Sequence, residues 1–109
     1  MPLRQVDVAH PPMRSAEAEV MLDELLRELR GKGPGQALKV IHGHGGSGVL
    51  KETVRNWAWR NRFRLHGVVP GESYAITDPP TVAMRAVCGQ EPDPDLGQEN
   101  PGITVLWIS

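Results

Sequence analysis

The chain has 109 residues, 39% of them hydrophobic, with 12 basic residues, 13 acidic residues and a single cysteine. This length suits one domain with a core of its own, and the near-neutral charge excludes a strongly basic nucleic-acid-binding arm. The lone Cys88 excludes an internal disulfide and a multi-cysteine zinc site. No apolar run reaches the ~18 residues of a membrane span and residues 1–7 are unlike a signal peptide, so we expect a cytoplasmic protein without a membrane partner.

The first half of the chain predicts a strand, a helix and a second strand. Residues 6–9 alternate apolar with small or polar side chains, which is typical of a short strand. Residues 16–30 carry apolar side chains at helical spacing, with Ser15 as the expected N-cap and Gly31 as the stop. Residues 37–41 are rich in branched side chains and predict the second strand.

The second half predicts a helix over 49–61 and strands over 65–69 and 103–108. Residues 70–102 hold ten glycines and prolines and form an insertion before the last strand. Within it, Asp78 and two following prolines predict the start of a short helix over 81–87.

Four strands and two long helices in this order predict an α/β fold. We expect a four-stranded mixed sheet with helices packed on it, occupying residues 1–109 as one domain. Residues 90–101 contain four acids, three prolines and no base, so this part of the insertion is expected to be mobile. The sequence leaves the oligomeric state open, and a monomer is compatible with it.

The glycine loop at residues 43–48, Gly-His-Gly-Gly-Ser-Gly, is the most informative stretch. It leaves a predicted strand and opens a predicted helix, so free backbone amides and the positive end of the helix dipole face one space, which suits an oxyanion. Because the carboxyl ends of two parallel strands lie side by side, the first strand is expected to bring Asp7 and His10 to this loop, beside His42 and His44.

Other interpretations of this loop are weaker or stay open. The loop satisfies the Gly-x-Gly-x-x-Gly pattern of dinucleotide-binding proteins, but the chain is too short for two nucleotide-binding halves. Val49 and Leu50 stand where a phosphate-loop NTPase needs Lys and Ser or Thr. A tight turn without a ligand remains an alternative, as does a transition-metal site with ligands drawn from Asp7, His10, His42 and His44.

Charge is unevenly distributed along the chain. Residues 51–64 carry a net charge of +4, whereas the predicted first helix carries −3 and residues 71–109 carry −5. The second helix and its exit, with Lys51, Arg55, Arg62 and Arg64, therefore form a basic face next to the glycine loop, which favours a phosphate backbone.

The segment from Val40 to Lys51 resembles the second motif of Smr (small MutS-related) domains, a strand followed by His-Gly-x-Gly, a turn and Leu-Lys. Residues 6–8 are similar to the start of the family's first motif, Leu-Asp-Leu-His-Gly, and residues 101–107 are similar to its closing strand. The resemblance implies a two-layer α/β sandwich of βαβαββ order. It also implies nucleic-acid binding, often with DNA-nicking or RNA-cleaving endonuclease activity and a link to DNA repair.

Carried onto this chain, the resemblance makes Asp7 the first-motif aspartate and His42, Gly43 and Gly45 the His-Gly-x-Gly loop. The first-motif histidine falls on Ala9 and its glycine on His10. Either a local shift of the chain lets His10 stand in for the histidine, or the histidine is absent and phosphate binding persists without cleavage.

The leading prediction is a nucleic-acid-binding domain that hydrolyses phosphodiester bonds. His42 or His10 is expected to act as general acid or base and Asp7 to orient a histidine or help hold a cation, while Lys51 or Arg55 offsets developing charge. The residues expected to bind phosphate or nucleic acid are Gly43, His44, Gly45, Gly46, Ser47, Gly48, Lys51, Arg55, Arg62 and Arg64.

Two alternatives are a non-catalytic nucleic-acid- or ribosome-binding module and a binder of small phosphate compounds. The sequence does not choose DNA over RNA, and it leaves open whether a divalent cation takes part.

Overall fold

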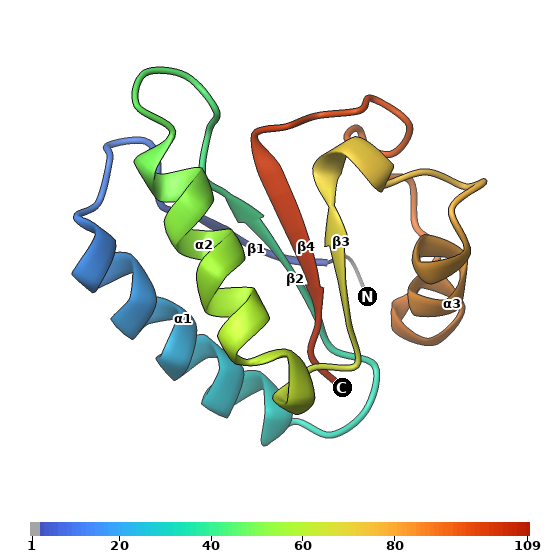
Figure 1. The fold of residues 1–109 in the computed structure, drawn as a ribbon. Helices are drawn as coiled ribbons and strands as arrows, with labels where there is room; N and C mark the ends of the chain where they lie inside the picture. The colour runs from blue at the N-terminus through green and yellow to red at the C-terminus, as the bar shows by residue number, and fades with distance from the viewer. Residues whose placement is uncertain (1–2) are drawn as a thin grey trace.

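The computed structural model describes residues 3–109, in which four strands form one mixed sheet with three helices packed on it (Figure 1). Met1 and Pro2, the start of segment 1–7, lie outside the described residues. The strand order is β1–β2–β4–β3, with β1 parallel to β2 and β4 antiparallel to both of its neighbours. This confirms the predicted α/β fold. The elements in chain order are β1 (Arg4–Asp7), α1 (Ser15–Arg30), β2 (Ala37–Ile41), α2 (Val49–Arg60), η1 (Arg62–Arg64), β3 (Gly67–Pro70), η2 (Gly71–Ser73), α3 (Pro79–Cys88) and β4 (Ile103–Trp107).

Helices α1 and α2 cover one face of the sheet, as the leucine spacing of α1 predicts (Figure 1). Buried side chains from both helices meet those of β2 and β4 in one apolar cluster, the main driving force for this layer. The indole of Trp57 is buried there, and its Nε1 donates a hydrogen bond to Asp23 Oδ1 at 2.9 Å, so the ring's polar atom is paired. None of the helices in residues 3–109 is long and apolar enough to cross a membrane.

The two predicted helix caps differ in outcome. Asp78 caps α3, its carboxylate accepting a hydrogen bond from the Thr81 amide at 3.1 Å, as expected. The prediction that Ser15 caps α1 is wrong, because the helix already begins at Ser15 and Arg14 occupies the cap position without a side-chain bond. The Ser15 hydroxyl instead accepts a hydrogen bond from Thr53 Oγ1 of α2 at 3.0 Å, which ties the two helices together.

The insertion covers the second face of the sheet and adds a partial third layer to the predicted sandwich (Figure 1). Side chains of β4 alternate between the two faces, with Ile103 and Val105 packing against Tyr74 and Met84, while Leu106 packs under the long helices. A strand that is apolar on both faces needs cover on both sides, and α3 with its flanking loops supplies it.

The acidic segment at 90–101 is attached to the core through its carboxylates, which differs from the expectation that it is mobile. The side chain of Lys39, in the central strand β2, is 5% exposed and donates to Asp93 Oδ1 at 2.5 Å and Asp95 Oδ2 at 2.7 Å. The Tyr74 hydroxyl also donates to Asp93, at 2.8 Å. A buried ammonium needs paired charges, and the segment provides them.

Strands β1 and β3 are shifted from their predicted ranges of 6–9 and 65–69, and β4 ends one residue before the predicted 108. Strand β1 begins at Arg4 and ends at Asp7, so residues 8–10 belong to the turn that follows it. Strand β3 begins at Gly67, because residues 62–64 form the short helix η1 before it. The first shift matters for function, since it places both Asp7 and His10 at the carboxyl end of β1.

Candidate functional site

The carboxyl ends of β1 and β2 meet at one edge of the sheet, as predicted. Asp7 is in register with Ile41, and the Val8 amide donates to the Ile41 carbonyl at 2.9 Å. Beyond this pair the chain of β1 turns across the start of the glycine loop. The Ala9 methyl group lies 3.7 Å from where a Cβ on Gly43 would stand, so residue 9, on which the resemblance places a histidine, faces the loop with only a methyl group.

Asp7 and His10 form a hydrogen-bonded pair at this edge. Asp7 Oδ1 accepts the amides of Ala9 at 2.8 Å and His10 at 3.1 Å, and Oδ2 lies 3.0 Å from His10 Nδ1. Burial acts to raise the pKa of Asp7, but the hydrogen bonds from Ala9 and His10 outweigh it and the pKa lies below its ordinary value. The ionised carboxylate only accepts, so Nδ1 carries the proton. Nε2 has no hydrogen-bond partner among residues 3–109 and belongs to a ring that is 72% exposed.

His42 lies inside the protein instead of facing solvent. Its ring is buried, with Nδ1 2.7 Å from the Gly43 carbonyl and Nε2 2.8 Å from Thr104 Oγ1. A carbonyl only accepts, so Nδ1 donates and Nε2 accepts the hydroxyl proton of Thr104. Burial lowers the pKa of His42, with further lowering from Arg55 and Lys51, which favours this neutral form. Both ring nitrogens are therefore occupied.

The backbone amides of the glycine loop divide into bonded and open groups. Those of His42 and Gly43 donate to the Gly102 carbonyl at 2.9 and 3.0 Å, continuing the pairing of β2 with β4, and that of Gly48 donates to Gly45 at 3.3 Å. The expectation that the amides of Gly43 and Gly48 face a ligand is therefore wrong.

The amides of residues 44–47 have no protein acceptor within residues 3–109, and these four residues are exposed. Gly46 and Gly48 have φ of 60° and 69°, a region that favours glycine, and Gly48 caps α2 without a side-chain bond. The open amides and the start of α2 are the part of the glycine loop where the predicted anion site stays a prediction. His44 lies beside it, its Cδ2 3.4 Å from where a Cβ on Gly102 would stand.

Lys51 and Arg55 reach this edge from the first turns of α2, but both are engaged by Glu72 of η2. Arg55 donates through Nη2 to Glu72 Oε1 at 2.6 Å and through Nη1 to Oε2 at 3.1 Å, and Lys51 donates to Oε2 at 3.3 Å. The hydrogen bonds of Arg55 lower the pKa of Glu72 to about 2, so the carboxylate is ionised at neutral pH. A third Arg55 nitrogen, Nε, donates to Thr104 Oγ1 at 3.1 Å.

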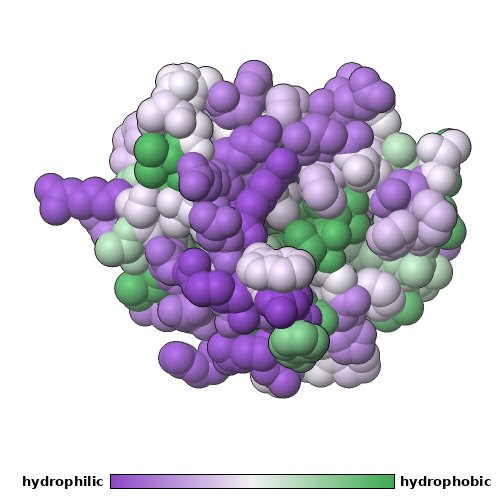
Figure 2. All heavy atoms as spheres, in the orientation of Figure 1, coloured by the Kyte–Doolittle hydropathy of each residue, from purple (hydrophilic) through white to green (hydrophobic). Residues whose placement is uncertain are grey.

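Arg62 and Arg64 do not join the glycine loop. They follow the opposite end of α2, about 18 Å away along a 12-residue helix (Figure 1). Figure 2 shows hydrophilic residues along much of the face that α2 presents. The basic face predicted as contiguous with the loop is thus divided between the two ends of α2.

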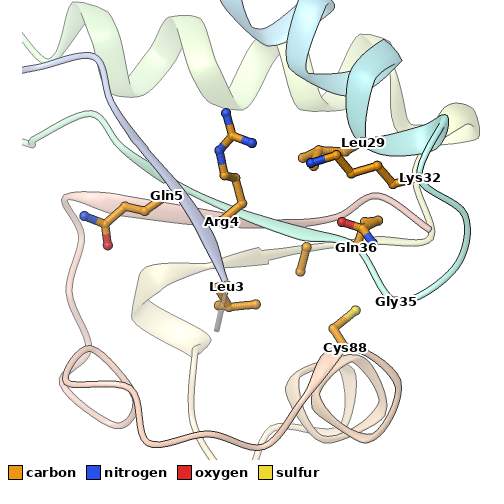
Figure 3. A pocket seen from close by; sticks show the side chains of 9 residues that line it. Leu3, Arg4, Gln5, Leu29, Lys32, Gly35, Gln36 and Cys88 are labelled. Atoms are coloured by element: carbon orange, nitrogen blue, oxygen red, sulfur yellow. The ribbon is translucent and has the colours of Figure 1, made fainter. Parts of the chain in front are cut away.

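A separate hollow of about 320 Å³ lies beside α1 and the start of β1, away from the glycine loop (Figure 3). It contains none of the predicted site residues. Cys88 points its sulfur toward it, and burial raises the pKa of this thiol, which keeps it protonated. Within residues 3–109, no group of three or more histidines, cysteines or carboxylates is arranged to hold a metal ion.

Comparison with protein-family models matches residues 11–70 to the Smr domain, which is more than half of the 109 residues. The chain belongs to the Smr domain family. Family membership places it among nucleic-acid-binding and nuclease-like domains. No curated protein and no solved structure matches the chain.

The matched segment of this Smr domain runs from the turn before α1 to the end of β3. Asp7, His10, Glu72 and Thr104 lie outside it, although all four are at the edge just described. Sequence reasoning found the first two but assigned no role to Glu72 or Thr104. The only feature of the sequence that could have pointed to Thr104 is its place in the closing-strand pattern. No feature of the sequence around Glu72 indicates that it binds side chains of α2.

Proposed function

We propose that this Smr domain binds a phosphodiester of DNA or RNA at the open amides of residues 44–47 and hydrolyses it with the Asp7–His10 pair. The observation that carries the proposal is an exposed imidazole, held by a carboxylate through Nδ1, on the same sheet edge as an uncapped, glycine-rich helix start. An amide cluster at a helix N-terminus suits phosphate oxygens, and an oriented histidine suits proton transfer.

In the proposed reaction, a water oxygen forms a bond to phosphorus and the bond from phosphorus to one sugar oxygen breaks. The proton lost by the water passes to His10 Nε2, and the departing sugar oxygen takes a proton from solvent. The ionised Asp7 stabilises the imidazolium that forms, because its Oδ2 stays bonded to Nδ1 throughout. The open amides offset the charge that develops on the non-bridging oxygens.

His42 takes a positioning role in this proposal. Its Nδ1–H donates to the Gly43 carbonyl at the entrance of the glycine loop, and its Nε2 is tied through the Thr104 hydroxyl to Arg55. The chain Arg55–Thr104–His42–Gly43 links the first turns of α2 to the peptide that precedes the open amides. His10, whose Nε2 is free, is therefore favoured over His42 as the acid or base.

The test is nicking of a supercoiled plasmid and cleavage of a structured RNA by wild type, His10→Gln and Asp7→Asn, with Mg²⁺, with Mn²⁺ and with a chelator. General acid–base groups contribute about 10²–10⁴-fold, so His10→Gln is expected to slow cleavage at least about 100-fold while the affinity for substrate stays within about twofold. Glu17→Gln, a nearby exposed carboxylate on α1, is the control and is expected to cleave normally.

Ala9 favours a second candidate, a nucleic-acid- or ribosome-binding module that does not cleave. It predicts salt-sensitive binding with no product under any of the three metal conditions. Wild-type rates in His10→Gln would refute the assignment of the acid or base, and a wild type that neither binds nor cleaves would refute both candidates.

A further inference from the structure

Two aromatic side chains stand exposed where α2 ends. Trp59 is 66% exposed and Phe63 is 87% exposed, whereas Trp57 and Tyr74 are buried. Exposing rings of this size next to each other leaves apolar area in water that a stable monomer would otherwise cover. The pair therefore calls for an explanation that packing of this chain does not give.

The guanidinium of Arg62 lies between these rings, with its carbon 3.8 Å from the centre of the Trp59 ring and 4.5 Å from that of Phe63. Its Nη1 donates to the Trp59 carbonyl at 2.7 Å, which fixes the side chain in place. Trp59, Arg62 and Phe63 thus form a cation–π cluster, here called the exit platform.

Arg60, in the last turn of α2, is paired with Glu19, but other arginines at the exit platform are not neutralised by carboxylates of residues 3–109. Arg62 and Arg64 have no carboxylate partner in the described part of the chain, and Arg30 at the end of α1 has no bonded partner among residues 3–109. Arg30, Phe63, Arg64 and His66 line a surface hollow of about 690 Å³. Lys51 and Arg55, at the other end of α2, are by contrast both paired with Glu72.

From this combination we propose that the exit platform binds unpaired nucleobases by stacking, with the neighbouring arginines on the adjoining phosphates. Aromatic and guanidinium planes accept the faces of any base, and unpaired cations track the backbone. The proposal rests on the proposed function and narrows its substrate. A nucleic-acid strand that reaches both the exit platform and the open amides must span about 18 Å, which corresponds to about five stacked nucleotides. The proposed substrate is therefore a nucleic acid with a single-stranded stretch next to the cleaved bond.

The experiment measures fluorescence anisotropy of labelled 12-nucleotide strands of DNA and of RNA, an abasic sugar–phosphate strand of equal length, and a blunt duplex. The proteins are wild type, Trp59→Ala/Phe63→Ala, and Trp59→Phe/Phe63→Tyr, which keeps the rings. Ile76→Ala/Val82→Ala, two exposed apolar residues in or beside α3, is the matched control. Ser47→Glu serves as a variant of the glycine loop.

Stacking of one base on an aromatic side chain raises the binding affinity about five- to a hundredfold. Wild type is therefore expected to bind the base-bearing strands at least about tenfold more tightly than the abasic strand. The double alanine variant is expected to lose that preference while binding the duplex as before. The ring-keeping variant is expected to retain it, and Ser47→Glu to weaken all probes alike. The DNA and RNA arms show which sugar is preferred.

Equal binding of base-bearing strands by wild type and the double alanine variant would overturn the exit platform, and the rings would then be assigned to a protein contact. If Ser47→Glu still weakened duplex binding in that case, the proposed function would stand without the platform. If wild type bound none of the probes at low salt, the proposed function and the platform would both fail.

Discussion

Arg60, in the last turn of α2, pairs with Glu19, but Arg62 just beyond it differs from Lys51 and Arg55 at the start of the helix in having no carboxylate partner among the described residues. At its start, Lys51 and Arg55 are held by Glu72, and the groups left open to a ligand are backbone amides. At its exit, Arg62 stacks on two exposed rings and no carboxylate among the described residues neutralises it. Basic residues that cluster in the sequence therefore do not form one surface. Whether a basic side chain is available to a ligand depends on which carboxylates the fold places next to it.

The largest effect on this difference is expected from a substitution that blocks the open amides at the start of α2. Ser47→Glu places a carboxylate beside the open amides, where it competes with a phosphate. We expect affinity and nicking rate to fall at least about tenfold, while Tm stays level or rises slightly, because an acidic group is favourable at a helix N-terminus. Plasmid nicking and a thermal melt measure the two effects, and Ser47→Gln is the neutral control. A variant that nicks normally would show that the amides do not hold the phosphate.

A smaller effect is expected from removing the carboxylate that makes the two ends different. Glu72→Gln frees Lys51 and Arg55, so affinity for a duplex is expected to rise severalfold. The slope of log affinity against log salt is expected to steepen by up to about two, one for each released cation that meets a phosphate.

Glu28→Gln is the matched control for this charge change, because Glu28 also faces two cations, Arg4 and Lys32, but on α1. It is expected to leave the salt slope unchanged. If both variants steepened the slope equally, the effect would be one of net charge and not of the α2 start.

The smallest expected effect concerns stability against pH. The pKa of His42 is lowered from 6.5 by burial, with Arg55 and Lys51 adding to the lowering and Glu72 opposing it. Below pH 6.5 the unfolded chain therefore binds a proton that the folded chain does not, and the free energy of unfolding decreases as pH falls. Glu72, with a pKa of about 2 against 4.5, loses its contribution only at lower pH.

Urea unfolding at pH 7.5, 6.5 and 5.5 measures this dependence. His42→Gln is expected to be less stable at pH 7.5 but nearly flat over the range, whereas His66→Gln, a change in an exposed ring, is expected to keep the wild-type slope. A wild type that is equally stable at pH 7.5 and 5.5 would contradict the buried neutral His42.

Local sequence patterns were sufficient to predict the helices and strands. They also predicted the sheet edge at which the carboxyl ends of β1 and β2 meet. The leucine spacing of α1 and the glycines before α2 are local features of the sequence. Parallel pairing of β1 with β2 follows because the helix α1 connects them. The meeting of Asp7 and His10 with the glycine loop was predictable for that reason.

What the sequence did not reveal depends on contacts between distant segments. His42 looked available because its neighbours are glycines, yet Thr104, 62 positions later, binds its Nε2. Glu72 neutralises Lys51 and Arg55 of α2 and follows directly after Gly71. A Cβ on Gly71 would lie 1.9 Å from the Asn100 carbonyl oxygen, so glycine is required there. No periodicity in one strand or helix encodes such pairings.

The carbonyl of Gly102 has a practical consequence for anyone shortening this protein. It accepts the amides of both His42 and Gly43, and so anchors the glycine loop from outside the segment that the family model recognises. A fragment cut to residues 11–70 would retain the signature residues but lose this anchor, along with Asp7 and His10. Such a fragment would keep the segment that identifies the family but not the contacts that hold the glycine loop.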